Sequence, residues 1–301
     1  MTSPTEDRWQ DVAEKGSVLA IRLLVVLATT LGRPAARAAL HLVAAWYVLF
    51  HPAVRRASRD YLVRLQRRAG LADVYRHVLC FARVTLDRLF LVRGDARSFE
   101  LSFNGEAHLR ALRDSRRGAL LLLSHVGSFE VLRASSEARD LPVAFLGYFR
   151  NARMINAALR ELNPAVDAQL IEIRPGDPSF VLEVEQRIAE GSPVGTMSDR
   201  VGFDGKSVVA PFLGTPARFP PGPYLLAAAL GCPVYLVFCL YREPNRYELH
   251  CEPFAERVSL PRAARAEALA GYAARYAARL EHYCRLAPLN WFNFYDFWSR
   301  S

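Results

Sequence analysis

The sequence lacks several features that would point to common classes of protein. Its five cysteines are an odd number with no C-x-x-C pair, so neither a disulfide framework nor a zinc site is predicted. We expect buried thiols in a reducing compartment, and neither a metal nor another cofactor. Glycine and proline are not in excess, and no low-complexity tract or internal repeat occurs, which argues against general disorder.

Lysine is nearly absent. Of the 39 basic residues, 37 are arginine and the others are Lys15 and Lys206, a bias for which a GC-rich genome is the simplest account. The net charge of +9 favours acidic partners, namely nucleic acid, anionic lipid or an acidic carrier protein. Nucleic acid is disfavoured because the arginines are spread along the chain and no RNA- or DNA-binding signature is present.

The first 50 residues contain no clean apolar run of the roughly 20 residues that a spanning helix needs. Residues 1–16 are polar and slightly acidic, whereas a signal peptide would begin with a basic region, so secretion is not indicated. Two shorter apolar runs follow, at 17–31 and 35–50, separated by a Gly-Arg-Pro break. The second run ends in aromatic residues, which prefer membrane interfaces.

Six arginines lie in residues 55–68, directly after the apolar runs, and such a segment is attracted to anionic lipid. Apolar positions then recur at helical spacing through 71–92. We therefore expect residues 17–92 to be helical and residues 1–94 to form a membrane-associating segment. It would dip into or lie against a bilayer. The alternative is that both apolar runs are buried helices of a globular core.

From about residue 100 short apolar runs alternate with amphipathic segments, which predicts an α/β domain over residues 95–301 with a mostly parallel central sheet flanked by helices. The expected strands are 119–124, 142–146, 168–173, 193–197, 233–241 and 247–252. The expected helices are 106–115, 128–138, 151–162, 178–190, 221–231 and 261–285. An aromatic-rich stretch, 290–298, is expected to pack as a lid or core edge.

The stretch ALLLLSHVGSFEVLR, residues 119–133, carries the candidate chemistry. His125 follows an apolar strand, at the sheet edge where open α/β proteins place their sites. Gly127 permits a tight turn, Ser128 can cap the following helix, and Glu130 lies in its first turn. A four-residue turn can bring Glu130 back against His125.

A histidine and a carboxylate suit the activation of a hydroxyl group. A neutral imidazole can take the hydroxyl proton as attack begins, and a carboxylate stabilises the resulting imidazolium and fixes the tautomer. Backbone N–H groups near Gly127 and Ser128 are one source of donors for the negative charge that develops on a thioester oxygen. The spacing alone decides little, because composition predicts about 0.7 chance matches to H-x4-[DE].

The segment SHVGSFEVL resembles the first signature block of the lipid A biosynthesis acyltransferases, the lauroyl and myristoyl transferases within the lysophospholipid acyltransferase-like superfamily. The resemblance implies that His125 is the catalytic base and Glu130 its acidic partner. Further blocks follow in order at 145–156, 195–201 and 208–234. They imply substrate-binding roles for Arg150, Asp199 and Arg200, beside Gly127 and Ser128. A solvated surface charge would also account for Arg150, and a structural ion pair for Asp199.

The resemblance implies an acyltransferase that moves a fatty acyl group from a thioester, with acyl carrier protein as donor, to a hydroxyl of a membrane lipid, glycolipid or polyene lipid. It also implies a location at the cytoplasmic face of the inner membrane. The ending LNWFNFYDFW is similar to that of acyltransferases encoded with aryl polyene pigment biosynthesis. Two alternatives stay open: a lysophospholipid acyltransferase that uses acyl-CoA, and a catalytically silent membrane lipid-binding protein of the same fold.

Overall fold

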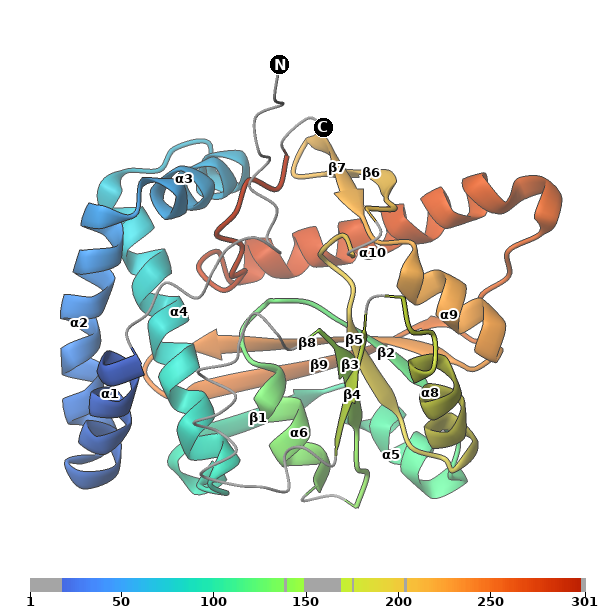
Figure 1. Ribbon diagram of the computed structural model, residues 1–301, viewed down its shortest axis with the longest axis horizontal. Helices are drawn as coiled ribbons and strands as arrows, with labels where there is room; N and C mark the ends of the chain where they lie inside the picture. The colour runs from blue at the N-terminus through green and yellow to red at the C-terminus, as the bar shows by residue number, and fades with distance from the viewer. Residues whose placement is uncertain (1–17, 138–139, 149–168, 175, 203–204, 299–301) are drawn as a thin grey trace.

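The computed structural model describes the chain except for residues 1–17, 138–139, 149–168, 175, 203–204 and 299–301. Within the described residues, four helices precede an α/β part in which helices cover both faces of a central sheet (Figure 1). The α/β fold with preceding helices that the sequence predicted is thereby confirmed.

The N-terminal helices pack on one another before the sheet begins. Their bounds are α1 Val18–Thr30, α2 Gly32–Phe50, α3 Pro52–Gln66 and α4 Leu71–Val92. Helix α2 buries every fourth residue (Ala36, Leu40, Ala44 and Val48), a spacing that forms one stripe along a helix, in a cluster shared with α4. None of the helices in the described parts of the chain is long and apolar enough to cross a bilayer.

A buried ion pair joins the helices to the sheet. The Asp87 carboxylate of α4 accepts hydrogen bonds of 2.7 and 2.9 Å from Arg33 of α2 and one of 2.9 Å from the Tyr247 hydroxyl. Three donors therefore compensate the burial of this carboxylate. The predicted boundary between residues 94 and 95 falls in the turn that follows α4.

The central sheet has seven strands in the order β1-β9-β8-β2-β5-β3-β4. Within this sheet every pairing of the described strands is parallel except that of β8 with β9, which is antiparallel. The bounds are β1 Glu100–Asn104, β2 Leu120–Leu123, β3 Ala144–Gly147, β4 Leu170–Glu172, β5 Val194–Met197, β8 Val234–Arg242 and β9 Arg246–Ala255.

Strand β2 lies in the middle of the sheet and all its residues are buried, as expected for a parallel strand that is covered on both faces. The helices of the α/β part are α5 Glu106–Ser115, α6 Phe129–Glu137, α8 Phe180–Ala189, α9 Gly222–Leu230 and α10 Arg265–Leu286, with short 3-10 helices at Ala96–Ser98 and Arg262–Ala264. Leu120 and Leu122 belong to the core beneath α9 and α10, whereas Leu121 and Leu123 belong to the core beneath α4, α5 and α6.

Three strands were not predicted. Strand β1 pairs at the edge of the sheet, where its residues are alternately exposed and half-buried, so it lacks a buried apolar face. The hairpin of β6 Val208–Phe212 and β7 Thr215–Phe219 pairs Pro211 with Pro216 and turns at Leu213 and Gly214, both with positive φ. Prolines disguise these strands in the sequence. The predicted helix 151–162 lies outside the described residues.

Candidate active site

The candidate site forms where two neighbouring parallel strands end. Strands β2 and β5 pair with Leu123 opposite Met197, and the Ser198 amide continues this pairing with a hydrogen bond of 3.0 Å to the Leu123 carbonyl. His125 and Asp199 each follow their own strand by two residues. The register of the sheet therefore places the imidazole beside the Asp199 carboxylate.

Three hydrogen bonds hold the Asp199 carboxylate. His125 Nδ1 lies 2.7 Å from Oδ1, and both the His125 amide and the Trp291 indole Nε1 donate to Oδ2 at 2.9 Å. Only 1% of the Asp199 side chain is exposed. This buried carboxylate is thus fixed in one orientation relative to the imidazole ring.

Near neutral pH, the charges and burial around this pair keep Asp199 ionised and His125 neutral. Burial alone would raise the pKa of Asp199, but contact with His125 and the nearby Arg200 lower it to about 2. Burial and the charge of Arg200 lower the pKa of His125 below 6.5, and they outweigh the opposite effect of Asp199. Because an ionised carboxylate can only accept hydrogen bonds, His125 Nδ1 must carry the ring proton that it donates to Asp199. His125 Nε2 therefore keeps its lone pair.

The exposed part of His125 matches this tautomer. The side chain is 28% exposed, and within the described parts of the chain Nε2 forms no hydrogen bond. The imidazole therefore has one nitrogen held by the protein and another available to take a proton. This is the arrangement required of a general base.

Glu130 does not form the pair with His125 that the sequence predicted. It lies in the first turn of α6, where Arg88 of α4 donates to its Oε1 at 3.0 Å and Arg133 donates to its Oε2 at 2.8 Å. Its side chain is 2% exposed, so two guanidinium groups compensate a buried charge. Asp199 provides the carboxylate at His125, and a catalytic role for Glu130 stays a prediction.

Gly127 and Ser128 shape the turn between β2 and α6. Gly127 has φ of +63°, and a Cβ there would lie 1.7 Å from the Cys239 carbonyl oxygen, so no larger residue fits. The Gly127 amide donates to the Asn290 carbonyl and the Ser128 amide to the Cys239 carbonyl. Both amides are thus engaged within the protein, and the expected pair of oxyanion donors is not free in this conformation.

Three predicted residues remain, namely Arg200, Ser128 and Arg150, and only the first two lie within the described residues. Arg200 donates to the Phe292 carbonyl at 2.9 Å and its guanidinium lies 5.6 Å from the Tyr295 ring centroid, so it binds the C-terminal stretch. The Ser128 hydroxyl is buried without a hydrogen bond to the described residues, so the predicted cap is not formed there. Arg150 lies outside the described residues.

Comparison with known families matches residues 85–300 to the family model of the bacterial lipid A biosynthesis acyltransferases. The chain belongs to this acyltransferase family. A comparison with curated proteins gave no match. The family match includes every predicted site residue but begins within α4, so α1, α2 and α3 lie outside it. Similarity to the aryl polyene subgroup stays a prediction.

Sequence reasoning missed two residues at the site of this acyltransferase. Trp291 contacts the Asp199 carboxylate across 92 positions of sequence, and Arg88 contacts Glu130 across 42. The aromatic stretch was a signal for Trp291, although a packing role explained it equally well. Nothing in the sequence distinguishes Arg88 from the other arginines, because partners far apart in sequence depend on how helices pack.

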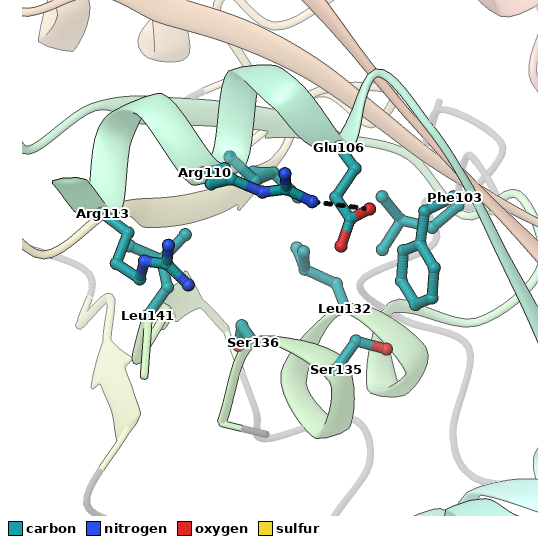
Figure 2. A pocket seen from close by; sticks show the side chains of 10 residues that line it. Phe103, Glu106, Arg110, Arg113, Leu132, Ser135, Ser136 and Leu141 are labelled. Atoms are coloured by element: carbon teal, nitrogen blue, oxygen red, sulfur yellow. Dashed lines mark ion pairs between the residues drawn. The ribbon is translucent and has the colours of Figure 1, made fainter. Parts of the chain in front are cut away.

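A separate pocket of about 380 Å³ lies between α5 and α6 (Figure 2). Its lining includes Leu109, Leu132 and Leu249, and Arg110 at its edge lies 3.4 Å from Glu106. None of the predicted site residues that the structure describes lines it. It therefore does not belong to the site around His125.

Proposed function

We propose that this protein transfers a fatty acyl group from an acyl carrier protein thioester to a hydroxyl of a membrane lipid, glycolipid or polyene lipid, with His125 as the general base. The observation that carries the proposal is the His125–Asp199 pair, in which Nδ1 is held and Nε2 is open. The depressed pKa of His125 supports the role, since a base must be neutral at the working pH.

The proposed reaction needs no nucleophile from the protein. The acceptor hydroxyl gives its proton to His125 Nε2 while its oxygen attacks the thioester carbonyl carbon. The tetrahedral intermediate then collapses, the carbon–sulfur bond breaks, and the imidazolium returns the proton to the leaving thiolate. Asp199 stabilises the imidazolium between these two steps. Arg150 stays a predicted substrate-binding residue, either as a donor to the oxyanion or as a group that binds a phosphate of the donor or acceptor.

The proposed donor and membrane follow from charge and exposed apolar surface. A net charge of +9 suits an acidic carrier protein. Helix α2 exposes Leu42, Trp46, Leu49 and Phe50, which are spaced so that they share one face. Arg56 and Arg59 on the next helix are also exposed, and each basic residue near an anionic surface adds about 1 kcal/mol of attraction. We propose that this face lies on the cytoplasmic leaflet of the inner membrane.

An acyl-transfer assay tests the proposal. The full-length protein is incubated with a radiolabelled fatty acyl group, carried as a thioester on either acyl carrier protein or CoA, and with a membrane lipid extract, beside His125→Ala and the exposed control His282→Ala. We expect labelled lipid from wild type and His282→Ala with the carrier protein, and loss of at least a hundredfold in His125→Ala. Equal turnover by all three would reject His125 as the base, and preference for acyl-CoA would reject the proposed donor.

A further inference from the structure

The C-terminal stretch 290–292 lies along the turn that carries His125. Val126 and Trp291 form an antiparallel bridge, the Gly127 amide donates to the Asn290 carbonyl at 2.9 Å, and the Phe292 amide donates to the His125 carbonyl at 2.8 Å. These hydrogen bonds hold the backbone of the catalytic turn. They join it to a stretch about 165 residues later in the chain.

The Trp291 side chain extends this attachment to the carboxylate. Its indole Nε1 donates to Asp199 Oδ2 at 2.9 Å, and the residue is fully buried. Tyr61, Phe212 and Phe297 enclose the indole, with ring centroids 4.9 to 5.2 Å away. An indole has a single donor and few accessible rotamers in such packing, so its N–H points in one fixed direction.

A second histidine holds the backbone carbonyl of Trp291. His77 of α4 donates from Nε2 to the Trp291 carbonyl at 2.9 Å, and its Nδ1 accepts from the Ser58 hydroxyl of α3 at 2.8 Å. Burial lowers the pKa of His77 to about 4, so the ring is neutral near pH 7 and this donor pattern is fixed. The connection thus runs from the N-terminal helices through Trp291 to Asp199.

We propose that Trp291 is a positioning residue for acyl transfer, whose indole N–H fixes the Asp199 carboxylate against His125 while His77 fixes Trp291. The inference rests on the proposed function, since it assigns a task to the C-terminal stretch within that same site. Trp291 is fully buried, its backbone bridges Val126 next to His125, and its indole holds the Asp199 carboxylate that contacts the imidazole, so it acts on the base through these neighbours.

Loss of the indole N–H has two consequences at His125. The carboxylate loses one of the contacts that fix it, which lowers the fraction of molecules with a correctly held imidazole. Without the indole donor, the negative charge of the Asp199 carboxylate is less compensated. The carboxylate then stabilises the imidazolium more strongly, so the pKa of His125 rises. Arg200 and Arg88, the other charged groups that act on His125, are unchanged.

The test compares Trp291→Phe with Trp298→Phe in the full-length protein. Trp298 belongs to the same aromatic cluster, and its buried Nε1 has no hydrogen-bond partner within the described residues, so it is a matched control. We expect Trp291→Phe to lower kcat about tenfold, leave KM within about twofold and move the acid limb of the pH–rate profile to higher pH. Trp298→Phe should behave as wild type. Equal kinetics and equal acid limbs for the two variants would overturn the proposal.

Two further measurements separate positioning from folding and from catalysis. Replacing Trp291 by β-(3-benzothienyl)alanine substitutes sulfur for the N–H while keeping the bicyclic shape, so it tests the hydrogen bond even if Trp291→Phe does not fold. NMR titration of the His125 ring needs no substrate. An unchanged His125 pKa in the sulfur variant would reject the role of Trp291. If wild type showed no turnover but the His125 pKa were raised in the sulfur variant, the proposed function would be rejected and the contact between Trp291 and Asp199 would stand.

Discussion

Helix α2 and strand β2 use the same kinds of apolar residue in opposite ways. In α2, Leu42, Leu49 and Phe50 each expose more than 60% of their surface, whereas each leucine of β2 is at most 3% exposed. Burial of the β2 leucines stabilises the fold and presents His125 at a strand end. The α2 residues contribute little to folding, because most of their surface stays in water.

We propose that this difference separates two tasks within the molecule. The sheet edge holds the candidate base rigidly, as catalysis requires. The exposed face of α2 offers apolar surface beside exposed arginines, as adsorption to an anionic membrane requires. If the separation is correct, variants at one region should leave the property of the other region intact.

The largest effect is expected at the base. His125→Gln should lower acyl transfer about a thousandfold, because the amide cannot accept a proton in the transition state. Binding to vesicles should be unchanged, since His125 lies on the sheet edge and not on α2. The transfer assay and vesicle co-sedimentation on one preparation check both statements. Loss of vesicle binding together with activity would contradict the separation.

The reverse prediction concerns the membrane. Trp46→Ser with Phe50→Ser should weaken binding to vesicles that contain anionic lipid about a hundredfold, because each side chain contributes about 1.5 kcal/mol or more of apolar transfer. Transfer to a water-soluble acceptor should persist. Leu182→Ser on α8, which removes an equally exposed leucine, is the control. Equal loss of binding in the control would mean that no particular face adsorbs.

Glu130 tests whether the second carboxylate serves the fold or the chemistry. Glu130→Ala should lower the free energy of unfolding by about 3 kcal/mol, because it leaves the buried Arg133 and the half-buried Arg88 without their anion. The acid limb of the activity should stay at the pH of wild type. Chemical denaturation and a pH–rate profile measure the two effects. A shifted acid limb with unchanged stability would assign Glu130 to the base itself.

An effect of similar size, confined to low pH, is expected from His77. Its pKa is about 4 in the folded protein, because burial lowers it against a weaker opposite effect of the Trp291 hydrogen bond, and about 6.5 in the unfolded chain. Below pH 6.5 the unfolded chain binds a proton that the folded protein does not, so stability falls as the pH drops to 4. The loss amounts to about 3 kcal/mol.

Denaturant melts of wild type and His77→Gln at several pH values check this expectation. The variant should lose less stability between pH 6.5 and 4, because glutamine has no proton to gain. Equal pH dependence in the two proteins would show that His77 titrates normally in the folded state, and would remove it as a fixed donor to Trp291.

The sequence predicted the parts of the molecule that depend on local pattern. The uninterrupted leucines of β2 predicted a covered strand, and the position of His125 after that strand predicted a residue at the sheet edge. The helix spanning α5 was predicted with its bounds because its apolar and polar residues alternate at helical spacing. These features arise from residues close together in the chain.

What the sequence could not predict depends on neighbours in space. Asp199 meets His125 only because β5 pairs directly with β2, an adjacency that the order of strands along the chain does not reveal. Glu130, closer in sequence, was the natural partner on spacing alone, yet α6 directs it to Arg88 and Arg133. The contact of Trp291 with Asp199 likewise follows from tertiary packing.

The pH–rate profile of wild type and Asp199→Asn tests the central claim most directly, namely that the His125–Asp199 pair supplies the base. In wild type kcat/KM should be level at neutral pH and fall as the pH drops through a value below 6.5, because burial and Arg200 depress the pKa of His125. Asp199→Asn should lower the plateau about a hundredfold and move the acid limb to still lower pH, since the imidazolium loses its anion. An unchanged plateau and acid limb in Asp199→Asn would contradict the account.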